Sequence, residues 1–169
     1  ETRCDKAAFC SRAGLDPARP IVGLLPGSRL QEISRLLPPM TATIAAIQRE
    51  MPEVQGVIGV APTIAREEAA SLIACGKDIP VVEDLTYEVM QHADLLLVAS
   101  GTATLESACF GTPLFVLYKL ARLSWWIGKR VVSIPNIGLV NVVAGRRIVP
   151  EFLQDDVCPE LLTPEAIAW

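Results

Sequence analysis

The chain has 169 residues, of which 51% are hydrophobic, 20% charged and 5% aromatic, and its formal charge is −4. That length and apolar content suit one well-packed domain and argue against disorder, because enough apolar surface can be buried to offset the ordering entropy. The net acidic charge argues against a general nucleic-acid binder. No uninterrupted apolar run reaches the roughly 18 residues that span a bilayer.

The ends of the chain and its cysteines give a first indication of context. The chain begins at Glu1 without an initiator Met or an apolar signal core, and residues 163–169 have the pattern of a helix that is just beginning. We therefore expect a piece of a longer protein. Five cysteines, at positions 4, 10, 75, 109 and 158, form no C-x-x-C pair. We expect reduced cytosolic thiols, with neither a disulfide framework nor a zinc site.

Short apolar runs alternate with helical patterns along the chain. The runs predict strands at residues 20–25, 54–60, 79–82, 94–99 and 114–117. Between them, the spacing predicts helices over about 33–50, 62–75, 86–92 and 102–110. Pro38-Pro39 is expected to kink or divide the first of these helices, and Asp84 or Thr86 to cap the third. Continuous apolar strands separated by helices predict one doubly wound α/β domain with a parallel sheet, covering residues 1–169.

The turn after the first strand, residues 25–32, reads Leu-Pro-Gly-Ser-Arg-Leu-Gln-Glu. In a doubly wound sheet, ligands bind beyond the carboxyl ends of the strands, where helix N-termini point outward. Gly27 permits close approach of a ligand to the backbone, Ser28 can cap the helix or bond an anion, and Arg29 supplies a fixed charge suited to a diphosphate. The turn is neither a Walker loop nor a G-x-G-x-x-G fingerprint. An ordinary turn with Ser28 as N-cap is the alternative.

A second turn, after the fourth strand, places small residues at a helix start: Ser100, Gly101, Thr102 and Ala103. We expect their amides to stay open to a ligand, and Glu106 to lie one turn into the helix on the face of Thr102. A carboxylate there can accept both hydroxyls of a ribose while the amides bind phosphates. The alternative is a carboxylate that only benefits from the positive end of the helix.

A third segment, residues 137–154, mixes apolar residues with polar ones. Asn141 stands between valines and must find a partner if it is buried. Arg146 and Arg147 form a basic pair, and Pro150-Glu151 is expected to open a short helix. Taken alone, this segment is an ordinary loop with a solvated arginine pair.

Together the three segments resemble the lipid-A-disaccharide synthase family. The resemblance rests on Pro26-Gly27-Ser28-Arg29 with Glu32, on Ser100-Gly101-Thr102-Ala103 with Glu106, and on Asn141-x-x-Ala144-Gly145-Arg146 with Glu151 and Gln154. The order and separations of the segments fit as well, from about Pro20 to Leu162.

The resemblance implies the Rossmann-like, UDP-sugar-binding donor domain of a two-domain GT-B glycosyltransferase, with the acceptor domain preceding Glu1. Such an enzyme transfers 2,3-diacylglucosamine from its UDP derivative to 2,3-diacylglucosamine 1-phosphate with inversion, releasing UDP and the β-1,6-linked lipid A disaccharide. The family needs no metal or other cofactor, which is consistent with a sequence that has no D-x-D motif and no His/Cys cluster. Its acyl-chain substrates imply a peripheral location on the cytoplasmic face of the inner membrane of a Gram-negative bacterium.

Carried over by position, Arg29 would neutralise the departing diphosphate with help from Ser28, the amides of residues 100–103 would bind the same phosphates, and Glu106 would hold the ribose. In the third segment, Asn141 matches a functional residue of the family, and two further residues match its motif. The full donor-binding set expected from the resemblance is Gly27, Ser28, Arg29, Ser100, Gly101, Thr102, Ala103, Glu106, Asn141, Glu151 and Gln154.

A general base must take the proton of the acceptor hydroxyl. We expect that base outside this chain, because the one histidine, His92, ends a short predicted helix before a buried strand and is interpreted as structural. Trp125 and Trp126 lie one turn from Lys129 and Arg130, which suits a membrane interface. Packing of these tryptophans on the sheet or on the absent domain is the alternative.

Other functions remain open. Another GT-B transferase, such as the UDP-GlcNAc transferase of peptidoglycan synthesis, would have a phosphate loop closer to G-G-S-x-G than the turn found here. A non-catalytic nucleotide-binding module would bind UDP without turnover. A purely structural α/β domain would show no ligand effect from changes at Arg29 or Glu106.

Overall fold

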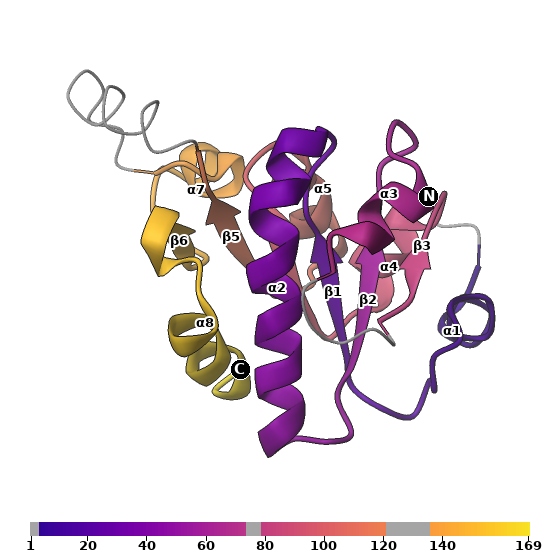
Figure 1. The fold of residues 1–169 in the computed structure, drawn as a ribbon. Helices are drawn as coiled ribbons and strands as arrows, with labels where there is room; N and C mark the ends of the chain where they lie inside the picture. Colours follow the sequence, from indigo (N-terminus) through magenta and orange to yellow (C-terminus); the bar gives the residue numbers. More distant parts are fainter. Residues whose placement is uncertain (1–3, 74–78, 121–135) are drawn as a thin grey trace.

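The computed structural model describes residues 4–73, 79–120 and 136–169. Its strands are β1 (Ile21–Leu25), β2 (Gln55–Gly59), β3 (Val81–Val82), β4 (Leu95–Ala99), β5 (Leu114–Tyr118) and β6 (Glu151–Leu153). Its helices are α1 (Lys6–Ala13), α2 (Leu30–Glu50), α3 (Arg66–Ser71), α4 (Thr86–His92), α5 (Thr102–Phe110), α7 (Leu139–Ala144) and α8 (Pro159–Ile167), with a 3-10 helix, η1 (Gln154–Asp156). The strands form one parallel sheet in the order β3-β2-β1-β4-β5-β6 (Figure 1).

Successive residues of the strands supply two hydrophobic cores, one on each face of the sheet. In β4, Leu95 and Leu97 belong to the core beneath α2 and α8, whereas Leu96 and Val98 belong to the core beneath α1 and α4. Figure 1 shows α2 and α8 next to each other in front of the sheet. This arrangement confirms the predicted doubly wound α/β fold, in which both faces of the sheet are covered.

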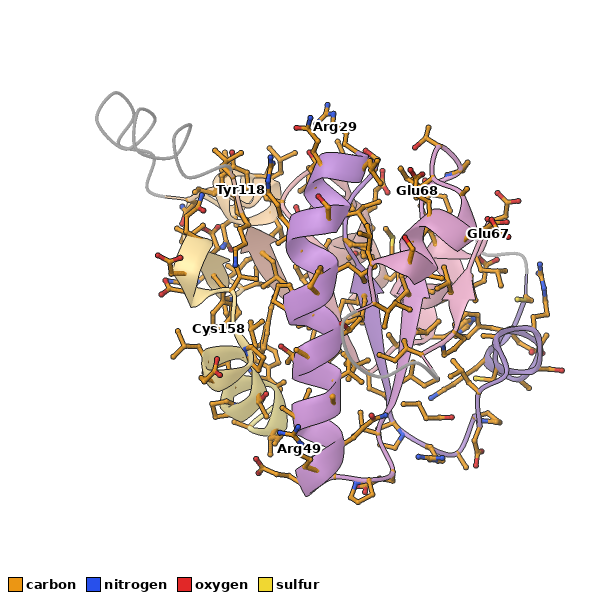
Figure 2. All side chains as sticks on the ribbon, viewed as in Figure 1. Arg29, Arg49, Glu67, Glu68, Tyr118 and Cys158 are labelled. Atoms are coloured by element: carbon orange, nitrogen blue, oxygen red, sulfur yellow. The ribbon has the colours of Figure 1, made fainter. Side chains whose placement is uncertain are left out.

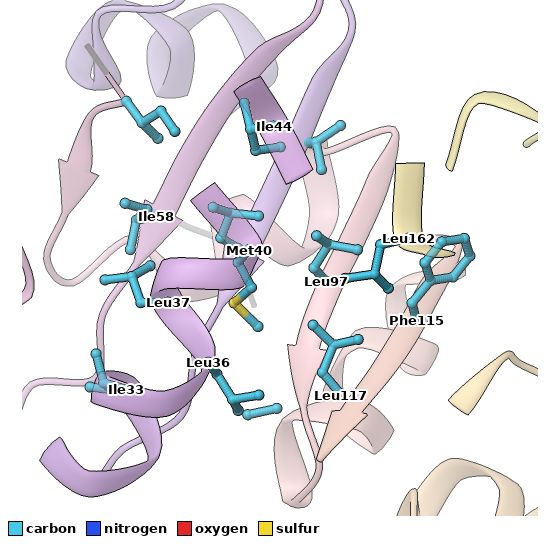
Figure 3. Close-up of a cluster of buried hydrophobic side chains, with 14 of the residues drawn as sticks. Ile33, Leu36, Leu37, Met40, Ile44, Ile58, Leu97, Phe115, Leu117 and Leu162 are labelled. Carbon is cyan, nitrogen blue, oxygen red and sulfur yellow. The ribbon is translucent and has the colours of Figure 1, made fainter. Parts of the chain in front are cut away.

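Helix α2 is the main cover of the first face. Ile33, Leu37 and Ile44 recur at helical spacing and are fully buried, and Figure 3 shows them among the side chains of the sheet. Pro38-Pro39 was expected to kink or divide this helix; the division is wrong, because α2 runs unbroken over 21 residues, and the kink stays a prediction. Each proline removes one backbone hydrogen bond of the helix. Burial of the apolar stripe on both sides of the prolines offsets that loss.

The five predicted strands are confirmed as β1 to β5, whereas α1, α7 and β6 were missed by the sequence patterns. The third segment is therefore not the ordinary loop that its residues alone predict, because it contains α7 and β6. The expectation that Pro150-Glu151 opens a helix is wrong. Glu151 begins the edge strand β6 and lies opposite Val116 of β5, and only Gln154–Asp156 form a helical turn. Pro150 fits in front of this strand because its carbonyl accepts the amide of Val116, at 2.9 Å, and no amide is required of it.

Two other predicted helices have different bounds in the structure. The helix predicted over 62–75 is confirmed only as α3, which begins at Arg66 and ends at Ser71. Residues 163–169 do not begin a helix, because α8 starts at Pro159 and ends at Ile167. Proline at the first helical position explains the earlier start, since its φ angle suits a helix and its missing amide is not needed there.

His92 is packed at the end of α4. Its Nε2 lies 3.1 Å from the carbonyl oxygen of Cys4, and its ring centroid lies 5.7 Å from that of Phe9. These contacts support a structural role for the histidine. Four cysteines have free thiols, namely Cys4, Cys10, Cys109 and Cys158. Burial raises the pKa of the Cys10 thiol, which lowers its reactivity as a nucleophile; Cys75 lies outside the described residues.

Within the described ranges, none of the helices is both long and apolar enough to cross a bilayer. The same ranges hold no group of three or more His, Cys, Asp or Glu side chains placed to bind a metal ion. The segment with Trp125 and Trp126 lies outside the described residues.

Candidate nucleotide-binding pocket

A pocket of about 650 Å³ opens at the edge of the sheet where the parallel strands end. This is the edge at which doubly wound folds bind ligands, and the volume falls within the roughly 300–1,000 Å³ of small-molecule sites. The walls come from the ends of β1, β2 and β4, from the turns that follow β1 to β4, and from the first turns of α2, α4, α5 and α7. They contain every predicted binding residue of the first two sequence segments, namely Gly27, Ser28, Arg29, Ser100, Gly101, Thr102, Ala103 and Glu106, together with Glu32.

The first wall is the turn between β1 and α2, where the chain passes close under a carboxylate. Gly27 has φ +110°, a backbone angle that favours glycine, and a Cβ there would lie 2.7 Å from Oε2 of Glu32, so the end of that side chain would have to move. Nη1 of Arg29 lies 2.9 Å from Oε1 of Glu32, yet the arginine side chain is 80% exposed. Figure 2 shows Arg29 extending from the first turn of α2. A cation is therefore presented at the rim of the pocket.

The alternative in which Ser28 caps α2 is wrong, whereas its expected contact with an anion stays a prediction. The N-cap is Arg29, and no side chain from the described part of the chain bonds this helix end. The carbonyl of Ser28 instead accepts the hydroxyl of Thr63, at 3.2 Å, which ties the turn to the segment after β2. The first amides of a helix have no partner inside the helix, so the start of α2 offers donors and partial positive charge to an anion in the pocket.

The second wall is the turn between β4 and α5. The amide of Ser100 donates to the carbonyl of Leu117 in β5 at 2.8 Å, so the expectation of four open amides is wrong for this residue. Gly101 is the N-cap of α5, and the amides of Thr102 and the next residue are the first of the helix, without intrahelical partners. Glu106 lies one turn further along and also lines the pocket. Amide donors and a carboxylate acceptor therefore face one space.

The third sequence segment is arranged differently from the first two. In the described part of the chain, Asn141, Glu151 and Gln154 fall outside the lining of the pocket. Asn141 is fully buried. Its Nδ2 donates to the carbonyl of Val149 at 2.9 Å and to Oε1 of Glu151 at 2.8 Å, and its Oδ1 accepts the amides of Ile148 and Val149 at 2.8 and 3.0 Å.

Glu151 and Gln154 also bond to the main chain. Oε2 of Glu151 accepts the amide of Ile137, and Oε1 accepts that of Gly138, both at 2.9 Å. Gln154 is buried and has φ +56°. With its amide oriented to satisfy both atoms, it donates to the carbonyl of Leu120 at 3.2 Å and accepts that residue's amide at 3.0 Å. The donor-binding role expected for these residues stays a prediction.

Sequence reasoning missed the far wall of the pocket, after β2 and β3. Ala61 and Pro62 line it beside Asp84, Thr86 and Tyr87. Neither expected cap of α4 is correct, because Leu85 is the N-cap. Asp84 adopts φ +55°, and the hydroxyl of Thr86 donates to a carbonyl at the end of β2. The one sequence signal that could have identified this wall is the position of the turns after β2 and β3, since both directly follow predicted strands.

Known proteins are similar to this chain over nearly its whole length. The family model described as lipid-A-disaccharide synthetase matches residues 1–168. The chain belongs to the lipid-A-disaccharide synthase family. It is 39% identical over 163 residues to the lipid-A-disaccharide synthase of Syntrophotalea carbinolica, covering 96% of this chain and 42% of that protein. It is 41% identical over 159 residues to the lipid-A-disaccharide synthase of Myxococcus xanthus, covering 94% of this chain and 42% of that protein. The chain thus spans about two-fifths of the length of these relatives.

Solved structures of low sequence identity share the fold. The ADP-heptose heptosyltransferase II of E. coli superposes with a TM-score of 0.57 at 15% identity, covering 96% of this chain and 50% of that one. The spinosyn rhamnosyltransferase SpnG, solved with thymidine diphosphate, superposes with a TM-score of 0.53 at 20% identity, covering 89% and 37%. These similarities confirm the predicted GT-B glycosyltransferase fold, of which this member of the lipid-A-disaccharide synthase family covers one part.

Proposed function

We propose that this chain binds the UDP portion of a UDP-sugar and forms the donor half of a GT-B glycosyltransferase. The observation that carries the proposal is the pocket itself. Two turns far apart in the sequence meet there, so that Arg29, the start of α5 and Glu106 line one space. A cation and open amides suit a diphosphate, and a carboxylate one helical turn away suits the two hydroxyls of a ribose.

The positive groups would act on the leaving group. Cleavage of the glycosidic bond to UDP places new negative charge on the diphosphate, so a guanidinium and a helix N-terminus aimed there stabilise the transition state more than the ground state. Each such contact is worth roughly 2–4 kcal/mol. Arg29 pairs with Glu32 across one turn and its side chain is 80% exposed, which leaves its outer face accessible to an anion. These charges support a reaction that needs no metal or other cofactor.

The complete reaction proposed is the family's: transfer of 2,3-diacylglucosamine from its UDP derivative to 2,3-diacylglucosamine 1-phosphate, with inversion at the anomeric carbon. Membership of the family supports it, as do the three motif segments in their order. The acceptor site and the general base would come from a domain outside this chain. Because both substrates carry acyl chains, we place the reaction on the cytoplasmic face of the inner membrane.

A calorimetric titration with UDP tests the donor site, with CMP and ADP as controls for the base. We expect selective UDP binding, weakened by about 1–2 kcal/mol in Glu106→Ala and by a similar amount in Arg29→Ala, the scale of a lost charge-assisted hydrogen bond. Glu160→Ala removes an exposed carboxylate from the first turn of α8 and serves as the matched control. EDTA should leave the affinity unchanged.

Equal affinity for UDP and ADP, or equal affinity of all variants, would contradict the donor site. If the folded chain binds none of the nucleotides, the titration is repeated on the protein with the acceptor domain attached. Failure there too rejects the proposal. Disaccharide synthesis by that longer protein then separates the proposed reaction from that of another UDP-sugar transferase, which would bind UDP and make no lipid A disaccharide.

A further inference from the structure

We propose that Asn141 and Glu151 are positioning residues, which hold one wall of the pocket in place without contacting the nucleotide. The inference rests on the proposed function and refines it, since the family resemblance assigns Asn141 to the functional set. Their hydrogen bonds hold the amides of Ile137 and Gly138, and the next residue, Leu139, lines the pocket.

The bonding capacity of Asn141 is fully used inside the protein. A side-chain amide has two N–H donors and two acceptor lone pairs on its oxygen. In Asn141, both donors and both lone pairs have partners, three of them on the main chain of Ile148 and Val149 and the fourth on Glu151. The residue is also fully buried. A direct bond from Asn141 to a ligand would require one of these four bonds to break.

The carboxylate of Glu151 joins the loop to the sheet. Glu151 is fixed by its position in β6, opposite Val116 of β5, and it accepts the amides of Ile137 and Gly138 in addition to the amide of Asn141. A Cβ on Gly138 would lie 2.8 Å from Cγ2 of Val116 and 3.2 Å from Oε1 of Glu151. The backbone at Gly138 is therefore enclosed between a side chain of the sheet and the carboxylate.

The same loop touches the phosphate-binding end of α5. The carbonyl of Ile137 accepts the hydroxyl of Ser100 at 3.0 Å, so the residue whose amide is held by Glu151 also holds the turn before α5. Two positions further, Leu139 lines the pocket. A chain of bonds thus runs from Asn141 through Glu151 and Ile137 to Ser100.

The loss of either polar partner should therefore reach the pocket. Glu151→Gln exchanges one carboxylate oxygen for a donor, so at least one of three N–H groups loses its acceptor. Asn141→Asp exchanges a donor for an oxygen that faces the carboxylate of Glu151. In the double variant, the new glutamine can donate to the new aspartate, which restores the bond between the two side chains in reverse.

The experiment measures UDP affinity by calorimetry for both single variants and the double variant, with Asp155→Asn as a matched change of an exposed carboxylate. We expect each single variant to raise the dissociation constant by about tenfold or more. The double variant should bind UDP at least as tightly as the single variant that has the lower affinity, because the two changes act on one bond. Amide hydrogen exchange without ligand should accelerate at Ile137 and Gly138 in the single variants.

Two results would overturn the inference alone. In the first, the fold-changes in the dissociation constant for the single variants multiply in the double variant, and amide hydrogen exchange at Ile137 and Gly138 is unchanged. That result would indicate direct contact between Asn141 and the nucleotide. UDP affinity unchanged in both single variants would show that the pocket does not depend on the pair. If the unaltered protein, with its acceptor domain attached, fails to bind UDP, the proposed function fails first, and the role of the pair in the pocket fails with it.

Discussion

The turn from Pro26 to Glu32 and the loop from Ile137 to Glu151, which includes the short helix α7, use their polar side chains in opposite ways. In the turn, Arg29 is 80% exposed and its bond to Glu32 spans a single helical turn. In the loop, Asn141 is fully buried, and it and Glu151 are bonded to the protein's own main chain. A polar residue in a motif can therefore bind a ligand only through donors and acceptors that have no partner inside the fold.

The largest effect should come from removing the buried amide. Asn141→Leu leaves two amides, a carbonyl and the carboxylate of Glu151 without that partner, and we expect the free energy of unfolding to fall by about 2–4 kcal/mol. Arg29→Ala should change it by less than about 0.5 kcal/mol, since the side chain is exposed. Urea denaturation of both variants measures the contrast. If the free energy of unfolding falls by similar amounts in the two variants, the turn and the loop do not differ in how much their polar side chains stabilise the fold.

Within the turn, Gly27 has a positive φ angle that disfavours a side chain. Gly27→Ala forces a Cβ to within 2.7 Å of Oε2 of Glu32 at φ +110°, so we expect a loss of about 2–3 kcal/mol. Gly111→Ala is the matched control, because it also has positive φ, at +76°, but a Cβ there meets open space; it should cost about 1 kcal/mol. Thermal unfolding of both gives the difference. Equal losses would show that Glu32 moves aside freely.

The smallest effect is expected at Glu32. Its ion pair with Arg29 is largely solvated, and exposed pairs contribute roughly 0–1 kcal/mol, so Glu32→Gln should leave the unfolding midpoint in urea almost unchanged. Glu151→Gln is the same chemical change in the loop and should lower the midpoint clearly. A large fall in the urea midpoint for Glu32→Gln would mean that side-chain bonds stabilise the turn as strongly as they stabilise the loop.

Much of the fold follows from sequence patterns, because β1 to β5 are apolar runs long enough to be recognised and the helices between them have clear periodicity. Strand β6 could not be predicted in this way, since it has three residues and starts with a carboxylate. Its identity depends on pairing with β5, which is a tertiary contact. The left-handed backbone of Asp84 and the helix α1 were equally invisible to the patterns.

The candidate site was predictable in part for a related reason. The turns at Gly27 and Gly101 directly follow strands, and the topology of a parallel sheet brings such turns to one edge. The partner of Asn141 was not predictable, because Glu151 lies ten residues further along and on another element. Only the folded loop shows that this pair is bonded internally, and that Ser100 gives its amide to β5.

The strand order has a consequence for how fast the chain folds. Strand β1 pairs with β2 on one side, the next strand in the sequence, and with β4 on the other, where Val22 lies opposite Leu95. The second pairing closes a long loop before its contacts are gained, which slows folding relative to structures built from local contacts. We expect β1, α2 and β2 to assemble early and the addition of β4 to limit the rate. Until β4 is added, the backbone N–H and C=O groups on that side of β1 stay unpaired and can pair with another chain.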